Sequence, residues 1–563
     1  MNNNKHLSVL GVCLVAPLMA MAQEDGSRIQ RRFETPPEPR STLQPLLFPI
    51  DEKSPPAQAA QIRFTLKELS IKGNTAFSTE ELATLYSPLV GKEVTLLDIY
   101  QLRNAITARY GNAGFGLSKA VIPEQRISAE GLVRIDVIEG FVDDVVIEGG
   151  SDDQREFLNY ASEKIRAERP LNVLTLERYL LLANDRYAIK VTSTMKPSEN
   201  TPAASTLILK VEPAAKLEGG ATFDNRGTQQ VGPNQVFVNL SINGLGGRAS
   251  QTAVGYATTS RTSELQYFSI FHTEVLSNEG TFLTLGWIDS VSKPGTTALR
   301  LLDNKSDYEA WSIRLAHPFL RTRQENLTAS VKYEQQDTDN KYLDVLTIQD
   351  KVRALRFGLN YDNADAYEGI NQALLQYSLG LQSLGATSQN NPLRSRVDAE
   401  DHFQKLTVNL SRTQELAYFS PLLSKFSVYA ALMGQYSATG LLSSEECGIG
   451  GQQFGRAYDP SEILGDSCLA GSLEFRYTPD TAGTPFKNAQ FYAWYDGGST
   501  TNHTALSAFD AKTKSLASAG LGVRFGLGPY LSGYIEAAQP LTREVANEGN
   551  NNTRFFASIS ARF

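Results

Sequence analysis

The sequence predicts a transmembrane β-barrel of about 16 antiparallel strands, preceded by two small α+β domains. Three observations support this fold class. The 348 residues from 216 to 563 repeat an alternation of apolar and polar residues, with almost no helical spacing. The last of these alternating segments ends at Phe563. Residues 64–212 instead show one order of strands and helices twice, which indicates an internal repeat.

Composition and motif content exclude several functional classes. The chain has 53 Lys+Arg against 61 Asp+Glu, a formal net charge of -8, which argues against a nucleic-acid binder. Only the N-terminal apolar run approaches the roughly 20 residues of a membrane helix, so a polytopic helical transporter is excluded. The 3 Cys and 5 His show no metal spacing, and no H-E-x-x-H, G-x-S-x-G or P-loop occurs. We therefore expect no catalytic residue, no metal and no cofactor.

The N-terminal 62 residues are predicted to hold a signal peptide and a linker. Lys5 and His6 precede an apolar run that ends at the small-residue cleavage pattern 20–22, so residues 1–22 read as the signal peptide. Within residues 23–62, Gln23–Phe33 is a candidate short helix. The prolines that follow cannot continue helices or central strands, and they indicate an extended linker.

Residues 63–140 and 141–213 are predicted to form two domains with the order β-α-α-β-β. In the first, 64–72 alternates as a strand, and Ser78-Thr79-Glu80-Glu81 is a capping box that opens a helix. Strands and helices of the same order recur in the second domain. The alternative is any other small α+β domain, against which the duplication argues.

Residues 214–563 are predicted to form the barrel. One face of a predicted strand carries Val236, Val238, Leu240 and Ile242, and the other carries Phe237, Asn239 and Ser241. Similar alternating segments recur up to Phe555–Phe563. One face of each strand suits lipid and the other suits a wet lumen, and a closed barrel leaves no unpaired edge in the membrane. At about 20–22 residues per strand and connection, about 16 strands fit. For the last strand, the alternative is an edge strand of a soluble β domain.

Several of these segments resemble a known family. The stretch Phe64–Ser78, F-T-L-K-E-L-S-I-K-G-N-T-A-F-S, is similar to the opening of the POTRA domain, a strand followed by G-N-x-x-F/Y. The barrel region resembles the two-partner secretion transporters (TpsB, of the ShlB/FhaC/HecB hemolysin secretion/activation type) of the POTRA-barrel superfamily. The first-strand signature F-D-N-R-G of these transporters stands at Phe223, Asp224, Asn225, Arg226 and Gly227. Phe563 is similar to the C-terminal signal of outer-membrane barrels.

The same resemblance implies a loop around 445–470 that folds back into the barrel lumen. In the family its tip carries an arginine motif of the V-R-G-F/Y type; here the tip reads Phe454, Gly455, Arg456, Ala457 and Tyr458. Gly455 replaces the valine and Ala457 replaces the glycine, which leaves the conformation of the tip open.

The resemblance also implies an acidic partner for the loop arginine. The family has it within F/G-x-D-x-G, which residues 494–498 match at Asp496 and Gly498. A buried arginine needs a paired, hydrogen-bonded carboxylate, so a bidentate Arg456–Asp496 pair would fix the loop in one pose. The alternative is a screened pair in a watery lumen, worth under about 1 kcal/mol. We expect the nearby charges Glu474, Arg476, Arg524 and Glu536 to be solvated lumen lining.

The two cysteines downstream of the signal peptide bracket this motif. Cys447 and Cys468 stand 21 positions apart. In an exported protein they predict a disulfide at the neck of the inward loop; free thiols are the alternative.

The resemblance implies an outer-membrane transporter with its POTRA domains in the periplasm. These domains would recognise one large, unfolded exoprotein of the β-helical TpsA type, which passes through the barrel to the cell surface. Further expected partners are outer-membrane lipid and the barrel-assembly machinery, and Gln23–Phe33 is the candidate plug of the resting pore. The alternatives are a barrel insertase and, less favoured, a passive porin. The sequence does not name the cargo.

Overall fold

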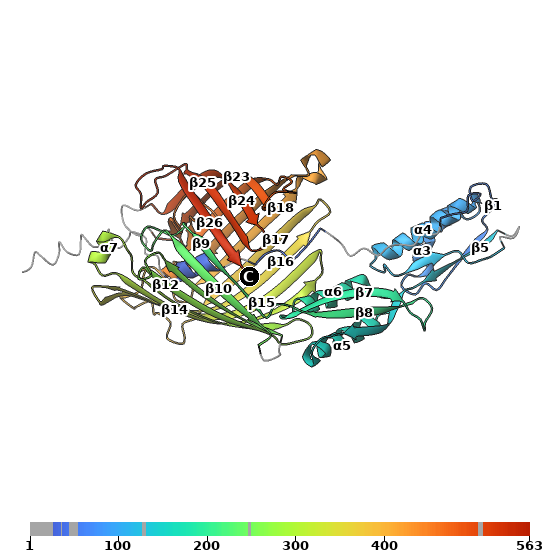
Figure 1. The fold of residues 1–563 in the computed structure, drawn as a ribbon, viewed down its shortest axis with the longest axis horizontal. Helices are drawn as coiled ribbons and strands as arrows, with labels where there is room; N and C mark the ends of the chain where they lie inside the picture. The colour runs from blue at the N-terminus through green and yellow to red at the C-terminus, as the bar shows by residue number, and fades with distance from the viewer. Residues whose placement is uncertain (1–25, 35–36, 44–53, 127–130, 246–248, 505–510) are drawn as a thin grey trace, which may run out of the picture.

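A computed structural model describes residues 26–34, 37–43, 54–126, 131–245, 249–504 and 511–563. The predicted signal peptide lies outside these residues. A closed β-barrel and two small α+β domains follow one another along the long axis of the molecule (Figure 1). No helix in the described part of the chain is both long enough and apolar enough to cross a membrane.

The first small domain packs two helices on a three-stranded sheet of order β2-β5-β4. A separate pair of three-residue strands, β1 and β3, joins the start of the domain to the start of its long helix; the sequence pattern did not predict this pair. Both helices begin at capping boxes, formed by Ser78 with Glu81 and by Thr95 with Asp98. Its elements are β1 Arg63–Thr65, β2 Glu68–Lys72, α3 Thr79–Tyr86, η1 Ser87–Leu89, β3 Glu93–Thr95, α4 Leu96–Asn112, β4 Lys119–Val121 and β5 Leu132–Ile138.

The carboxylate of Glu139 holds the G-N-T-A-F segment of this domain in place. Glu139, just after β5, accepts hydrogen bonds from the backbone N–H groups of Thr75 (2.7 Å) and Ala76 (2.8 Å) and from the Tyr110 hydroxyl (2.8 Å). Burial raises the pKa of Glu139, but these hydrogen bonds outweigh it and hold the pKa below its ordinary value. Phe77 then packs edge-on against Tyr110, with ring centroids 4.9 Å apart. The motif therefore closes the end of the domain core.

The second small domain repeats this plan around a sheet of order β6-β8-β7. Helices α5 and α6 bury Phe157, Leu158 and Leu176 against the sheet residues Leu207 and Leu209. The elements are β6 Phe141–Glu148, α5 Asp152–Ala167, α6 Val173–Asn184, β7 Ile189–Pro197 and β8 Ala204–Pro213.

A polar junction ties the second small domain to the barrel. Glu279, in the turn between two barrel strands, accepts hydrogen bonds from the hydroxyls of Tyr160 and Tyr179 (2.8 Å each) and from Arg178 (3.0 Å). Burial raises the pKa of Glu279, but these donors outweigh it and lower the pKa, so the carboxylate stays charged. Asp185 binds Arg321 of the barrel through two bonds of 2.7 and 2.8 Å. These contacts set the angle at which the domain meets the barrel.

Sixteen described strands close into an antiparallel barrel, which confirms the predicted fold class. The strand order runs from β10 to β19, then β22 to β26 and β9, and the first and last strands close the ring. Side chains alternate between the outer face and the lumen, as Leu473 (55% exposed) and Glu474 (1% exposed) illustrate. The strands are β9 Leu217–Asp224, β10 Gln235–Asn243, β11 Ser250–Thr259, β12 Leu265–Val275, β13 Phe282–Ser292, β14 Lys305–Arg321, β15 Glu325–Tyr342, β16 Val345–Ala364, β17 Gly369–Gly380, β18 Gln404–Glu415, β19 Phe426–Ser437, β22 Ser467–Tyr477, β23 Phe486–Thr501, β24 Thr513–Leu527, β25 Leu531–Pro540 and β26 Arg554–Arg562.

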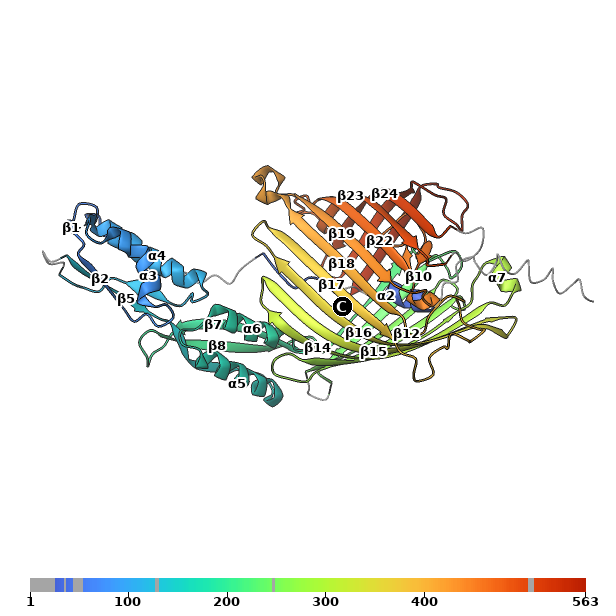
Figure 2. The ribbon, with the colours of Figure 1, turned by 180° about the vertical axis from the view of Figure 1, so that it is seen from behind.

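Shorter elements connect or fill the barrel. Helix α2, Gly26–Phe33, lies inside it in both views (Figures 1 and 2). The two-stranded hairpin β20, Cys447–Ile449, and β21, Ile463–Gly465, belongs to the connection between β19 and β22. The remaining elements are α7 Thr297–Leu301, η3 Leu416–Tyr418, η4 Pro421–Leu423 and η5 Ser443–Glu445.

Candidate functional site

The connection between β19 and β22, residues 438–466, folds back against the inner barrel wall. Its apolar residues Ile449 and Ile463, in β20 and β21, are each 1% exposed and share one cluster with Tyr492 and Trp494 of β23. A disulfide joins Cys447, at the start of β20, to Cys468 in β22, with the Cα atoms 6.1 Å apart. The hairpin is therefore attached covalently to the wall at its neck.

Arg456, at the tip of this loop, forms a bidentate ion pair with Asp496 of β23. Its Nε and Nη2 atoms donate to the two carboxylate oxygens over 2.9 and 3.0 Å, and its backbone N–H donates to the same carboxylate over 3.2 Å. Asp496 is fully buried and Arg456 is 6% exposed. A charge pair buried to this degree needs every donor satisfied, because a lone charge there is costly. The predicted partners are thus brought together, in the fork geometry that only arginine offers.

Further wall groups complete the arginine's surroundings. The Nη1 atom of Arg456 donates to Glu474 over 2.6 Å and Nη2 donates to the Ser472 hydroxyl over 3.2 Å, while the guanidinium carbon lies 4.1 Å from the centre of the Trp494 ring. A cation over an aromatic face gains electrostatic stabilisation when it is shielded from water. Each of the three guanidinium nitrogens therefore has an acceptor.

The expectation of solvated lining is wrong for two of the four nearby charges. Glu474 is 1% exposed beneath Arg456 of the loop, and Glu536 is 2% exposed, where it accepts hydrogen bonds from Arg226 and Tyr492. Glu474 also accepts hydrogen bonds from Arg476 and Arg524, whose side chains keep 19% and 38% exposure. Alternation along a strand predicts which way a side chain points, but it does not predict what will cover it.

The backbone of the loop tip explains both departures from the family motif. Gly455 has φ +74°, and a Cβ there would lie 2.7 Å from Leu516 of β24, so valine does not fit this position. Ala457 is fully buried and takes an ordinary negative φ, so its methyl group is tolerated. Tyr458 donates through its hydroxyl to a wall carbonyl, and Phe454 is buried in the same cluster.

Gly498, the last residue of the matched acidic motif, makes room for the loop. A Cβ on Gly498 would lie 2.8 Å from Ile449 of the loop hairpin and 2.8 Å from Ala470 of the neighbouring strand. The motif therefore supplies both the carboxylate and the space for the loop to approach it.

The first-strand signature F-D-N-R-G connects the two ends of the barrel sheet to the loop tip. Asn225 exchanges hydrogen bonds with the backbone of β26 at Phe555 and Ala557, and Asp224 accepts the Arg226 N–H over 2.8 Å. The Arg226 guanidinium pairs with Glu536 and donates to the Arg456 carbonyl over 3.2 Å. Phe223 points to the outer face and is 44% exposed, and a Cβ at Gly227 would meet the Gly232 carbonyl at 2.0 Å. Phe563 covers Gly219 of β9 with its ring.

A second buried charge cluster holds the root of the loop, and sequence reasoning missed it. Glu445 accepts two hydrogen bonds from Arg356 of β16, at 2.6 and 3.1 Å, and pairs with Lys405 of β18 at 2.6 Å. Glu446 pairs with Arg396 at 3.0 Å. In the sequence, the signal for this cluster was the adjacent pair Glu445-Glu446, because two neighbouring carboxylates in a loop rich in apolar and small residues need cationic partners.

Helix α2 packs against this second cluster and against the barrel wall. Arg31 donates to the backbone carbonyls of Ser444 (3.0 Å) and Glu446 (2.9 Å), and Arg28 lies 3.6 Å from the Glu446 carboxylate. Phe33 stacks on Phe237, with centroids 5.4 Å apart, and a Cβ on Gly26 would meet Tyr308 at 2.0 Å. The helix is thus seated in the lumen by specific contacts.

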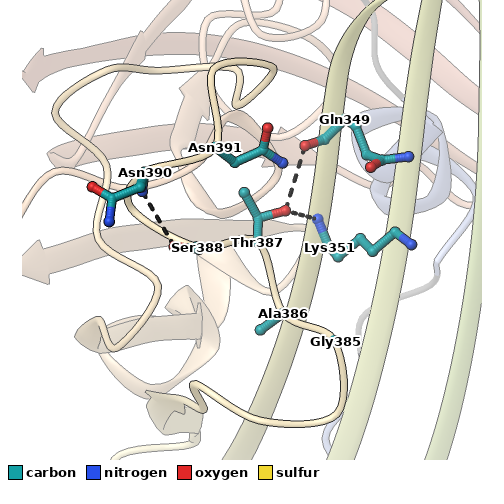
Figure 3. A pocket seen from close by; sticks show the side chains of 8 residues that line it. All are labelled: Gln349, Lys351, Gly385, Ala386, Thr387, Ser388, Asn390 and Asn391. Atoms are coloured by element: carbon teal, nitrogen blue, oxygen red, sulfur yellow. Dashed lines mark hydrogen bonds between the residues drawn. The ribbon is translucent and has the colours of Figure 1, made fainter.

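Outside the lumen, a hydrophilic hollow lies between β16 and the segment 381–403 (Figure 3). The Thr387 hydroxyl accepts the Lys351 N–H over 2.7 Å and donates to the Gln349 carbonyl there. None of the predicted site residues lines it. Within the described residues, no group of three or more His, Cys, Asp or Glu side chains is arranged to hold a metal ion.

Comparison with known proteins resolves the family. The family model for the haemolysin secretion/activation protein ShlB/FhaC/HecB matches residues 203–525, more than half of the chain. The chain belongs to this family. A POTRA domain model of the ShlB type matches residues 64–140.

Relatives of this ShlB/FhaC/HecB member span its length at low identity. The heme/hemopexin transporter protein HuxB of Haemophilus influenzae (strain 86-028NP) is 23% identical over 564 residues, 98% of this chain and 97% of the relative. The outer membrane transporter CdiB of Dickeya dadantii is 24% identical over 451 residues, 78% of this chain and 77% of the relative.

Solved structures show the same fold. CdiB from Escherichia coli matches with a TM-score of 0.69 and 19% identity, over 100% of this chain and 99% of the other. BamA from Haemophilus ducreyi lacking POTRA domains 1-3 matches with a TM-score of 0.51 and 14% identity, over 89% of this chain and 100% of the other.

Family membership fixes the setting of the molecule. This is an outer-membrane β-barrel of the two-partner secretion type, with POTRA domains in the periplasm. The end of the barrel that carries the Glu279 and Arg321 junction is therefore the periplasmic end, and the outward strand faces contact lipid.

Proposed function

We propose that this chain exports one large partner protein, which its POTRA domains bind in the periplasm and its barrel passes to the cell surface in an unfolded, extended form. One observation carries the proposal. The lumen holds two elements, the loop 438–466 and helix α2, and both contact the wall through side chains rather than through the strand ladder. Helix α2 and the tip of the loop can move aside while the barrel stays closed and the disulfide keeps the neck of the loop on the wall.

The POTRA sheets offer a place for the partner to bind. In the order β6-β8-β7, strands β6 and β7 stand at the two edges, and β7 exposes the run Thr192, Ser193 and Thr194. An extended peptide adds to such an edge through backbone hydrogen bonds, without needing a folded partner. This supports recognition before translocation.

The cargo proposed is a secreted β-helical exoprotein. The relatives carry the names heme/hemopexin transporter and outer membrane transporter, and for this chain an adhesin, a cytolysin or a haem-scavenging protein each satisfies the proposal. A large exoprotein gene beside the gene for this chain would identify the cargo. Insertion of the chain by the barrel-assembly machinery stays a prediction.

Deletion of residues 64–139 tests the proposed function. The barrel core, the loop and α2 are retained, so a heat-modifiable barrel should still reach the outer membrane. Export of the partner should be lost, because the first binding domain is gone. Normal partner secretion by this variant would contradict the proposal.

The insertase alternative shares only the BamA-like fold. An insertase would be needed for other outer-membrane proteins, so their abundance should fall when the gene is deleted. Our proposal expects that abundance to stay unchanged while the partner is retained in the periplasm.

A further inference from the structure

The turn between β18 and β19, residues 416–425, exposes a group of large apolar side chains. It contains the two short helices η3 and η4. Tyr418, Phe419, Leu422 and Leu423 are 44%, 66%, 90% and 37% exposed. Exposed apolar side chains that stand together, rather than singly, mark an interaction surface. We call residues 416–425 the apolar turn.

The apolar turn lies at the periplasmic rim. The end of β18 pairs with the start of β17, with Gln414 opposite Gly369, and the turn before β17 follows Ala364, at the end of β16. Asn363 of β16 pairs with Glu325, which stands just after Arg321. Arg321 binds Asp185 in the polar junction between the second POTRA domain and the barrel, which we call the POTRA junction, so these turns share one rim. Figure 2 shows the apolar turn projecting from the strand ends on the side of the rim away from the second POTRA domain.

The backbone of the apolar turn is ordered, so its side chains are held outward. Phe419 and Ser420 both donate backbone hydrogen bonds to the Leu416 carbonyl, and Leu423 donates to Ser420. The Tyr418 ring packs edge-on against Tyr367 of the neighbouring turn (5.6 Å) and against Phe419 (5.2 Å). The exposure of this turn is therefore built into its fold.

The apolar turn continues an aromatic band on the lipid-facing surface. Phe426, the first residue of β19, stacks on Phe475 of β22 (5.5 Å) and contacts Tyr477 of the same strand in a tilted arrangement (4.9 Å), and Tyr477 stacks on Phe491 of β23 (6.4 Å). Aromatic rings of this kind gather at the membrane–water interface of barrels. Because Phe426 directly follows the turn, the exposed side chains stand beside the headgroup region.

The neighbouring periplasmic turn shows that this composition is not general. Residues 478–485, between β22 and β23, read T-P-D-T-A-G-T-P, with no aromatic and no aliphatic side chain larger than alanine apart from proline. That turn suits water, whereas the apolar turn suits an interface. Lys425, exposed at the end of the apolar turn, adds a cation that suits anionic lipid headgroups.

We propose that the apolar turn is an interfacial foot, which inserts Phe419 and Leu422 among the phospholipids of the periplasmic leaflet. The POTRA junction holds one side of the periplasmic rim, and the foot anchors the other side to the membrane. Short apolar surfaces insert only about 5–10 Å, to the boundary of headgroups and acyl chains. The proposal concerns lipid contact and does not depend on the cargo.

A fluorescent label on a single introduced thiol tests the foot. Leu422→Cys, labelled with an NBD dye, is compared with Ala482→Cys in the polar turn, in full-length protein reconstituted in phosphatidylethanolamine and phosphatidylglycerol vesicles. Cys447 and Cys468 form a disulfide, and Cys13 belongs to the predicted signal peptide, so the introduced thiol is the one that reacts in the mature protein. At position 422 we expect blue-shifted emission, quenching by a shallow nitroxide lipid, and roughly threefold less quenching by aqueous iodide than at position 482.

A second variant ties the signal to the apolar side chains. A label at Ser424→Cys should lose its lipid signal when Phe419→Ser and Leu422→Ser are added, while the barrel stays heat-modifiable. Equal iodide quenching at positions 422 and 482 would overturn the proposal. Protection of position 422 only after the secreted partner is added would also overturn it, and would assign the turn to protein docking.

Discussion

The inward loop is held at its two ends by charge clusters of opposite polarity. At the tip the loop supplies the cation, Arg456, and the wall supplies the carboxylates Asp496 and Glu474. At the root the loop supplies the carboxylate, Glu445, and the wall supplies the cations Arg356 and Lys405. A loop that shifted or reversed its path would bring like charges together. The order of charges along the loop, besides its shape, therefore specifies one pose of the loop.

The two clusters differ in what else they hold. The tip cluster joins the loop to Arg226 and so to the strand pair that closes the barrel. The root cluster joins the loop to helix α2 through Arg31 and Arg28. We therefore expect tip variants to affect the loop and root variants to affect both the loop and helix α2.

The largest effect is expected from reversing the root polarity. Glu445→Arg would place a third cation beside Arg356 and Lys405 in a buried site, and breaking a buried pair alone costs about 3–5 kcal/mol. Heat-modifiable mobility on gels should show little folded barrel, and secretion should be lost. Adding Lys405→Glu should restore part of both, because Arg356 then keeps its pair with the buried Glu334, whereas the exposed control Glu544→Arg should behave as wild type. Full folding and secretion of Glu445→Arg would show that the root cluster does not hold the loop.

A smaller loss is expected when the charge at the tip is kept but the fork is removed. Arg456→Lys retains one positive charge and loses the two parallel bonds to Asp496, so secretion should fall about tenfold. Arg476→Lys, at a partly exposed lumen arginine, is the matched control and should secrete normally. Equal activity of the two variants would return Arg456 to the role of a general lumen charge.

Helix α2 offers a way to distinguish the root cluster from the tip cluster, because Arg31 and Arg28 bind the root of the loop. Arg31→Ala removes the two bonds from α2 to the loop carbonyls, so α2 should leave the lumen more often and raise single-channel conductance in planar bilayers. Removal of Gln23–Phe33 sets the upper limit of that increase. Arg456→Lys should change conductance less than Arg31→Ala. Unchanged conductance after removal of the whole segment would mean that the loop alone closes the pore.

The smallest effect on function is expected from the disulfide. Cys447→Ser with Cys468→Ser removes a closed loop worth roughly 3 kcal/mol by chain entropy, but both charge clusters remain. The barrel should unfold at a lower temperature and still secrete. In the wild type, non-reducing peptide mapping should find Cys447 linked to Cys468, and alkylation of both thiols without reductant would contradict that link.

The sequence predicted the barrel and the tip pair but not the root cluster, for physical reasons. Alternation shows directly which strand face meets lipid, and the arginine motif with its D-x-G partner pointed to Arg456 and Asp496. Glu445 and Arg356 stand 89 positions apart with no motif at either end. Three-residue strands such as β1 carry too few positions to show a period. The burial of Glu474 depends on the loop that covers it, which strand pattern alone does not contain.

A double-mutant cycle on Arg456 and Asp496, read out as the rate of partner secretion, measures whether this pair holds the loop in its working pose. Because Asp496 is fully buried beneath the arginine fork, Arg456→Ala and Asp496→Ala should each lower secretion about tenfold or more, with the barrels still inserted. The double variant should fall within about twofold of the worse single variant, since partners in one contact are not additive. Losses that multiply in the double variant would show that the two residues act separately, and would contradict a loop held in place by this pair.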